Sequence, residues 1–74
     1  HTRLLADKYY YYFNYLVPDK PEEFIAAIDL LMAKTKSNEA IYNYTLKWVT
    51  NAFTTAKKEE VLKHINDTYK QVPR

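Results

Sequence analysis

The sequence contains no glycine among its 74 residues, whereas average usage of about 7% would supply roughly five. Glycine provides the positive φ angles of tight hairpins and is the commonest residue just after a helix. Its absence disfavours β-hairpins and phosphate-binding glycine loops. Cysteine is also absent, which excludes disulfides, thiolate–metal sites and thiol chemistry within this chain. We therefore predict an all-α fold.

The length allows one domain at most, here residues 1–74, with a core that gives only marginal stability. Because the chain opens with HTRLL rather than methionine, we expect a fragment excised from a longer protein. It has no signal-like segment and no apolar run of about 18 residues, so we expect no direct membrane insertion. A net charge of +2 is too balanced to indicate a nucleic-acid partner.

Residues 2–17 form the first predicted helix, which Pro18 ends because the residue before a proline avoids helical geometry. This helix contains the aromatic run KYYYYFNYL. Successive helical residues point in different directions, so the four consecutive tyrosines cannot share one role. We assign Leu5, Tyr9, Tyr12, Phe13 and Leu16 to the core, Arg3, Asp7, Tyr10 and Asn14 to solvent, and Leu4, Tyr11 and Tyr15 to a second stripe.

Three further helices are predicted at about 20–36, 38–54 and 56–71, each with apolar residues at helical spacing. The third helix has the widest apolar face, which suits a central helix with two neighbours, and Trp48 is expected at the centre of the core. Short connections favour antiparallel neighbours, so we expect a small four-helix up-down array. Each of these three further helices has a candidate N-terminal cap: Asp19 with Glu22 as a capping box for the second helix, Ser37 or Asn38 for the third, and Thr54 or Thr55 for the fourth.

One cluster of residues is a candidate reactive site, because Glu60, His64 and Asp67 share a helix face. These side chains can ligate a metal. A solvated charged face is the favoured interpretation, because that face lies opposite the apolar stripe and no second helix offers a matching histidine. Neither a nucleophile–base pair nor a carboxylate pair in a cleft is evident. We expect no enzyme activity, no catalytic residue, no metal and no cofactor.

Two surfaces are candidates for interaction. One is the stripe of Leu4, Tyr11 and Tyr15, since tyrosine is enriched in interfaces. The other is the outer face of the second helix, formed by Ala26, Leu30 and Ala33. Ordinary exposed apolar surface is an equally good interpretation of each. The sequence favours a docking module, with a neighbouring domain or a protein as partner and a monomer or weak dimer as the state. The alternative is a small ligand- or glycan-binding module that uses the tyrosine stripe.

Residues 8–70 show a distinctive series of features: an aromatic-rich helix ending in LVP, a Pro–acidic helix start, and the segments AIDLLM, IYNYTLKW and HINDTY. In this order they resemble a helical domain of unknown function in bacterial envelope thiol–disulfide interchange proteins. In those proteins the domain lies just upstream of a thioredoxin-like domain.

The resemblance implies an exported, lipid-anchored parent in the periplasm or cell envelope, with its redox motif beyond Arg74. No catalytic residue carries over to this chain, because that motif is absent from it. The implied role is a non-catalytic accessory domain, acting as a spacer or docking module of the larger protein.

Overall fold

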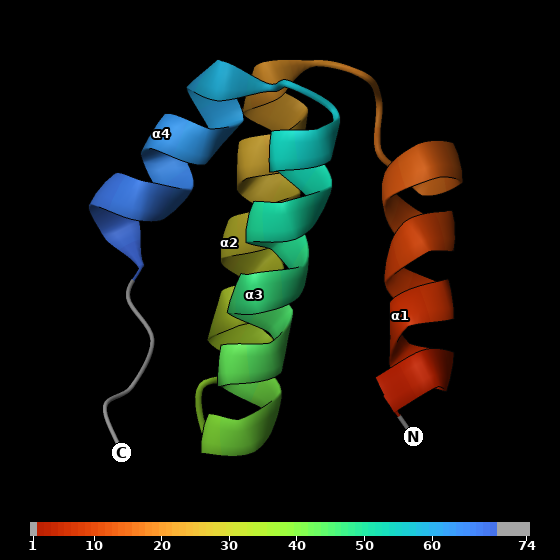
Figure 1. The fold of residues 1–74 in the computed structure, drawn as a ribbon, viewed down its shortest axis with the longest axis vertical. Helices are drawn as coiled ribbons and strands as arrows, with labels where there is room; N and C mark the ends of the chain where they lie inside the picture. The colour runs from red at the N-terminus through yellow and green to blue at the C-terminus, as the bar shows by residue number, and fades with distance from the viewer. Residues whose placement is uncertain (1, 70–74) are drawn as a thin grey trace.

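The computed structural model describes residues 2–69, and these form an all-α fold in which no strand occurs (Figure 1), as predicted. The last helix is shorter than the predicted 56–71: it begins at Glu59 and ends at Thr68, because Tyr69 already has an extended backbone, while residues 70 and 71 lie outside the described residues. The elements are α1 (Thr2–Tyr11), the π turn η1 (Tyr12–Leu16), α2 (Pro21–Thr35), α3 (Glu39–Thr55) and α4 (Glu59–Thr68).

The helices α2 and α3 lie side by side, α4 contacts both of them, and α1 lies on the opposite side (Figure 1). The short α4 is inclined to the other helices, so the arrangement does not establish the regular up-down array that we predicted. None of the helices within residues 2–69 has the length and hydrophobicity that a bilayer crossing requires.

The core consists of side chains from the predicted apolar stripes. Val49 and Val61 are completely buried, as is Ile28. The larger rings of Tyr9 and Phe13 extend from α1 and its π turn to this centre and are also buried. Burial of such side chains contributes about 1.5–3 kcal/mol each, which is the main stabilising term in a domain of this size.

The expectation that Trp48 occupies the centre of the core is wrong, because its side chain is only partly buried. The indole stacks on Phe13 at a centroid distance of 5.8 Å and meets the edge of Tyr9 at 5.4 Å. Aliphatic side chains from α2, α3 and α4 fill the centre instead. Trp48 therefore closes the edge of the core that faces α1.

One buried polar contact links α1 to α3. The hydroxyl groups of Tyr9 and Thr45 are 2.6 Å apart, and both residues are buried. Buried polar groups require such partners, since an unpaired one costs about 1–3 kcal/mol. This bond fixes the rotation of α1 against α3.

The last turn of the first helix is a π turn, in which the Val17 amide donates to the Tyr12 carbonyl at 3.0 Å. A π turn closes over five residues instead of four, so each residue advances less than 100° around the axis. Leu16 consequently leaves the predicted core face and is 61% exposed, while Val17 packs against the core. The assignment of Leu16 to the core is therefore wrong.

Helix starts also differ in part from expectation. The prediction that Asp19 and Glu22 form a capping box is wrong, because α2 begins at Pro21 without a side-chain cap. Asp19 instead forms an ion pair with Lys58 at 3.2 Å. At α3, Asn38 does cap, because its Oδ1 accepts from the Ile41 amide at 3.1 Å.

The predicted threonine cap of α4 is wrong as well. Thr54 donates its hydroxyl to the Thr50 carbonyl at 2.6 Å and Thr55 is the final residue of α3, so neither caps α4. The α3–α4 turn contains Lys57, which has a φ of 58°, the left-handed region that glycine adopts most easily. The Lys57 and Lys58 amides donate to the Thr54 and Phe53 carbonyls, which is the Schellman pattern of helix termination.

Candidate functional site

An apolar groove of about 670 Å³ runs between α1 and α2. Leu4 and Tyr11 border it from α1, and Leu30 borders it from α2; these side chains are 67%, 56% and 50% exposed. Leu5 and Leu31 lie deeper and are partly buried. Each bordering residue is large and apolar, so the groove leaves a continuous hydrophobic surface in contact with solvent.

The groove joins parts of the two surfaces that sequence reasoning treated separately. Leu4 and Tyr11 come from the predicted stripe on the first helix, and Leu30 comes from the predicted face of the second. Tyr15, the third residue of that stripe, packs on Tyr11 with ring centroids 5.1 Å apart but does not itself line the groove. Leu16, turned outward by the π turn, lines it too.

The two alanines of the predicted α2 face are not brought into this groove. Ala33 lines a different hollow beside Asp29 and Tyr69, and Ala26 is exposed outside both. The helical spacing is the cause: Ala26 and Ala33 both lie on one side of Leu30 around the helix axis, whereas Leu31 and Lys34, which line the groove, lie on the other side. Of the predicted α2 face, the groove contains Leu30 alone.

Charged side chains lie at the margin of the groove. Lys8 and Asp7 come from α1, and Lys34 comes from α2. The margin therefore carries two positive charges and one negative charge. An apolar ligand surface flanked by acidic groups would complement it in both hydrophobicity and charge.

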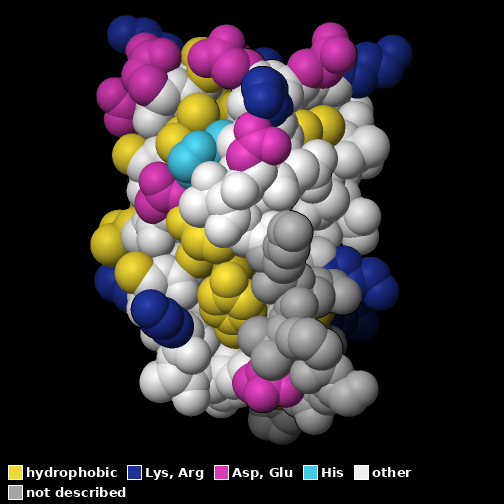
Figure 2. Space-filling view, turned by 90° about the vertical axis from the view of Figure 1, so that its left-hand side faces the viewer, with side chains coloured by type: hydrophobic (Ala, Val, Ile, Leu, Met, Phe, Trp, Pro, Cys, Tyr) yellow, Lys and Arg dark blue, Asp and Glu magenta, His cyan; other side chains and the backbone are white. Residues whose placement is uncertain are grey.

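A second cluster of polar residues connects α4 to α2. Asp29 Oδ1 is 2.9 Å from His64 Nε2 and accepts a 2.5 Å hydrogen bond from the Tyr69 hydroxyl. Figure 2 shows this face, where the histidine side chain lies among apolar and acidic side chains. His64 thus interacts across helices instead of lying on a fully solvated face. Sequence reasoning missed this cluster, because Asp29 and His64 are 35 positions apart and no local pattern connects them.

The cluster has a defined electrostatic character. Burial acts to raise the pKa of Asp29, but the hydrogen bonds from Tyr69 and His64, with the charge of His64, outweigh it and hold the pKa below its ordinary value. Burial, followed by the hydrogen bond to Asp29, raises the pKa of Tyr69 above its ordinary value. Asp29 therefore stays ionised and Tyr69 stays neutral near neutral pH, which preserves the link between α2 and α4.

The candidate metal-ligating cluster of Glu60, His64 and Asp67, which the sequence did not favour, is not assembled. Asp67 pairs with Lys63 at 2.9 Å, while His64 is directed to Asp29 on the neighbouring helix. Within residues 2–69, histidine and acidic side chains form no group of three that could hold a metal ion.

Comparison with known proteins adds no relative: no family model matches the chain, and no curated protein or solved structure gives a significant match.

Proposed function

We propose that this domain is a non-catalytic docking module that binds an amphipathic helix of another protein domain in the groove between α1 and α2. The ligand helix would place its apolar face in the groove and acidic residues near Lys8 and Lys34. Helix-in-groove binding uses such a surface, with a few large apolar anchors at i, i+3 or i+4, and i+7.

The observation that carries this proposal is the convergence of Leu4, Tyr11 and Leu30, each at least half exposed, around one hollow. Contiguous exposed apolar surface in a small domain marks interaction sites, and aromatic residues are frequent binding hot spots. The neighbouring aromatic ring of Tyr15 holds Tyr11 in place, which reduces the entropy lost on binding.

The envelope parent implied by the resemblance belongs to the same proposal. In that setting the domain would be an accessory module beside a thioredoxin-like domain in the periplasm. Binding in the groove does not depend on this setting, because residues of α1, the π turn and α2 alone form the groove.

Leu30→Glu tests the proposal directly. The probe is a fluorescein-labelled amphipathic peptide with leucines at i, i+3 and i+7 and glutamates beside them, and fluorescence anisotropy measures its binding to the 74-residue chain. The variant should weaken binding about tenfold or more, since it places a charge at an apolar anchor. Ala26→Glu on the same helix and Ile41→Glu on α3 are matched controls that should bind normally, because neither residue lines the groove.

Equal weakening in Leu30→Glu and Ile41→Glu would show non-specific hydrophobic binding and would refute the groove. Circular dichroism of each variant checks that the helices are retained. A peptide with lysines in place of the glutamates should bind less well. Equal binding would refute the preference for acidic residues near Lys8 and Lys34 but not the apolar groove itself.

The alternative of a glycan-binding module that uses Tyr11 and Tyr15 is less favoured. The groove beside Tyr11 is lined mainly by apolar side chains, so it offers few hydrogen-bonding partners to the hydroxyl groups of a sugar. This alternative stays a prediction that a titration with glycans, monitored by tyrosine NMR shifts, would test.

A further inference from the structure

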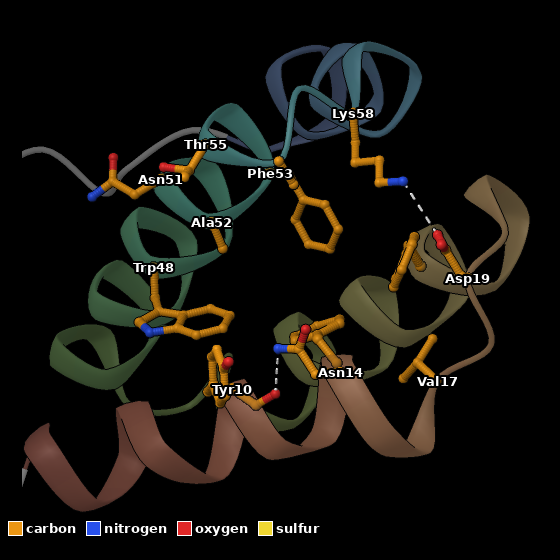
Figure 3. A pocket seen from close by; sticks show the side chains of 13 residues that line it. Tyr10, Asn14, Val17, Asp19, Trp48, Asn51, Ala52, Phe53, Thr55 and Lys58 are labelled. Carbon is orange, nitrogen blue, oxygen red and sulfur yellow. Dashed lines mark hydrogen bonds and ion pairs between the residues drawn. The ribbon is translucent and has the colours of Figure 1, made fainter.

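A second hollow, of about 650 Å³, lies between the π turn, α3 and the start of α4, away from the docking groove. Figure 3 shows Trp48 on one side of it, the Asp19–Lys58 ion pair on the other, and Phe53 directed toward the space between them. We refer to this hollow as the aromatic pocket. Its volume lies within the range of about 300–1,000 Å³ that small-ligand sites occupy.

The interior of the pocket is built from aromatic rings held in fixed positions. Phe13 stacks on Trp48 at 5.8 Å and meets Phe53 edge-on at 5.5 Å. Phe24 meets Phe53 at 5.1 Å. Since each ring supports the next, the walls are preorganised and would lose little conformational entropy on binding. Aromatic faces carry partial negative charge and attract the C–H groups of a flat aliphatic ring.

The edge of the pocket retains unused hydrogen-bonding capacity. The Asn14 side-chain nitrogen donates to the Tyr10 carbonyl at 2.7 Å, so the amide oxygen remains available as an acceptor (Figure 3). Asp19 uses Oδ1 for Lys58, which leaves Oδ2 to accept. The Lys58 ammonium has three N–H donors and uses one for Asp19. Donors and acceptors therefore occur side by side.

We propose that the aromatic pocket binds a neutral sugar, with a C–H face of the ring on Trp48 and its hydroxyl groups on Asp19, Lys58 and Asn14. A hydroxyl group both donates and accepts, and it therefore suits an edge that offers both functions. The charges of Asp19 and Lys58 cancel, so the pocket has no net charge to attract an ionic ligand. This site is distinct from Tyr11 and Tyr15 and does not depend on the docking groove.

Trp48 gives a direct assay, because it is the only tryptophan in the sequence and its indole lines the pocket. Titration of the 74-residue chain with maltose, chitobiose and methyl β-glucoside should change the indole fluorescence saturably for at least one of these sugars. Asp19→Ala removes an acceptor and the partner of Lys58, and it should weaken that binding about fivefold or more.

Asp67→Ala is the matched control, because it removes an ion pair of the same exposed kind, to Lys63, away from the pocket. It should leave sugar binding unchanged, as should Leu30→Glu in the groove. No saturable response to any of the three sugars would overturn the proposal, and so would equal weakening by the two aspartate variants. A response to adenosine or to a proline-rich peptide without a response to sugar would overturn the sugar assignment. None of these outcomes bears on the docking proposal.

Discussion

The replacement Lys57→Gly should stabilise the domain. Lys57 has a φ of 58° in the turn that ends α3, and this left-handed geometry costs a residue with a Cβ atom about 1–2 kcal/mol. Glycine removes that cost but gains about 0.5–1 kcal/mol of conformational freedom in the unfolded chain. The expected net gain in the free energy of unfolding is therefore about 0.5–1 kcal/mol. For a domain of this size the midpoint of thermal unfolding would rise by about 2–8 °C.

The assay is thermal and urea unfolding, followed by circular dichroism and by Trp48 fluorescence. Lys36→Gly is a matched control, because Lys36 also follows a helix, here α2, but has a φ of −57°. Glycine at that position should destabilise the domain by up to about 1 kcal/mol. Both replacements remove a positive charge near a helix C-terminus, so that effect largely cancels in the comparison.

Lys57→Ala separates the backbone effect from the loss of charge, since alanine keeps the Cβ atom. It should leave stability within about 0.5 kcal/mol of the native sequence. If Lys57→Gly is neutral or destabilising, or if Lys57→Ala stabilises as much, the φ argument is refuted.

Two further predictions concern the contacts between helices. Thr45→Val should reduce the free energy of unfolding by about 1–3 kcal/mol, because it leaves the buried Tyr9 hydroxyl unpaired. The double variant that also carries Tyr9→Phe should recover part of that loss. Urea unfolding measures the double-mutant cycle, and strictly additive effects would contradict this prediction. The depressed pKa of Asp29 predicts that its contribution to stability is present above the unfolded-state value of 3.8 and is lost as the pH falls through the lower folded value. The stability difference between the native chain and Asp29→Asn should therefore shrink between about pH 6 and about pH 3, and a constant difference would count against the bonds from His64 and Tyr69.

The helices and most of the core followed from local patterns in the sequence. The predicted apolar spacing of the second helix agrees with the burial of Phe24, Ile28 and Met32, because a 3.6-residue period determines which side chains share a face. The absence of glycine correctly indicated an all-α fold. It gave no position for the α3–α4 turn, since the residue that takes the left-handed conformation there is a lysine.

The remaining features depend on tertiary packing. Leu4, Tyr11 and Leu30 were identified as surface candidates, but the groove that unites them requires α1 and α2 to lie together. The link from Asp29 to His64 likewise requires α4 to lie against α2. Such contacts between distant residues have no period or spacing in a single sequence.

The π turn supplies both hollows with an aliphatic side chain, because Leu16 borders the docking groove and the adjacent Val17 lines the aromatic pocket. In an uninterrupted α-helix the side chains of Leu16 and Val17 would point in other directions around the helix axis. The one additional residue of the π turn therefore shapes both the docking groove and the aromatic pocket. A single deletion within residues 12–16 would straighten the segment and alter both together.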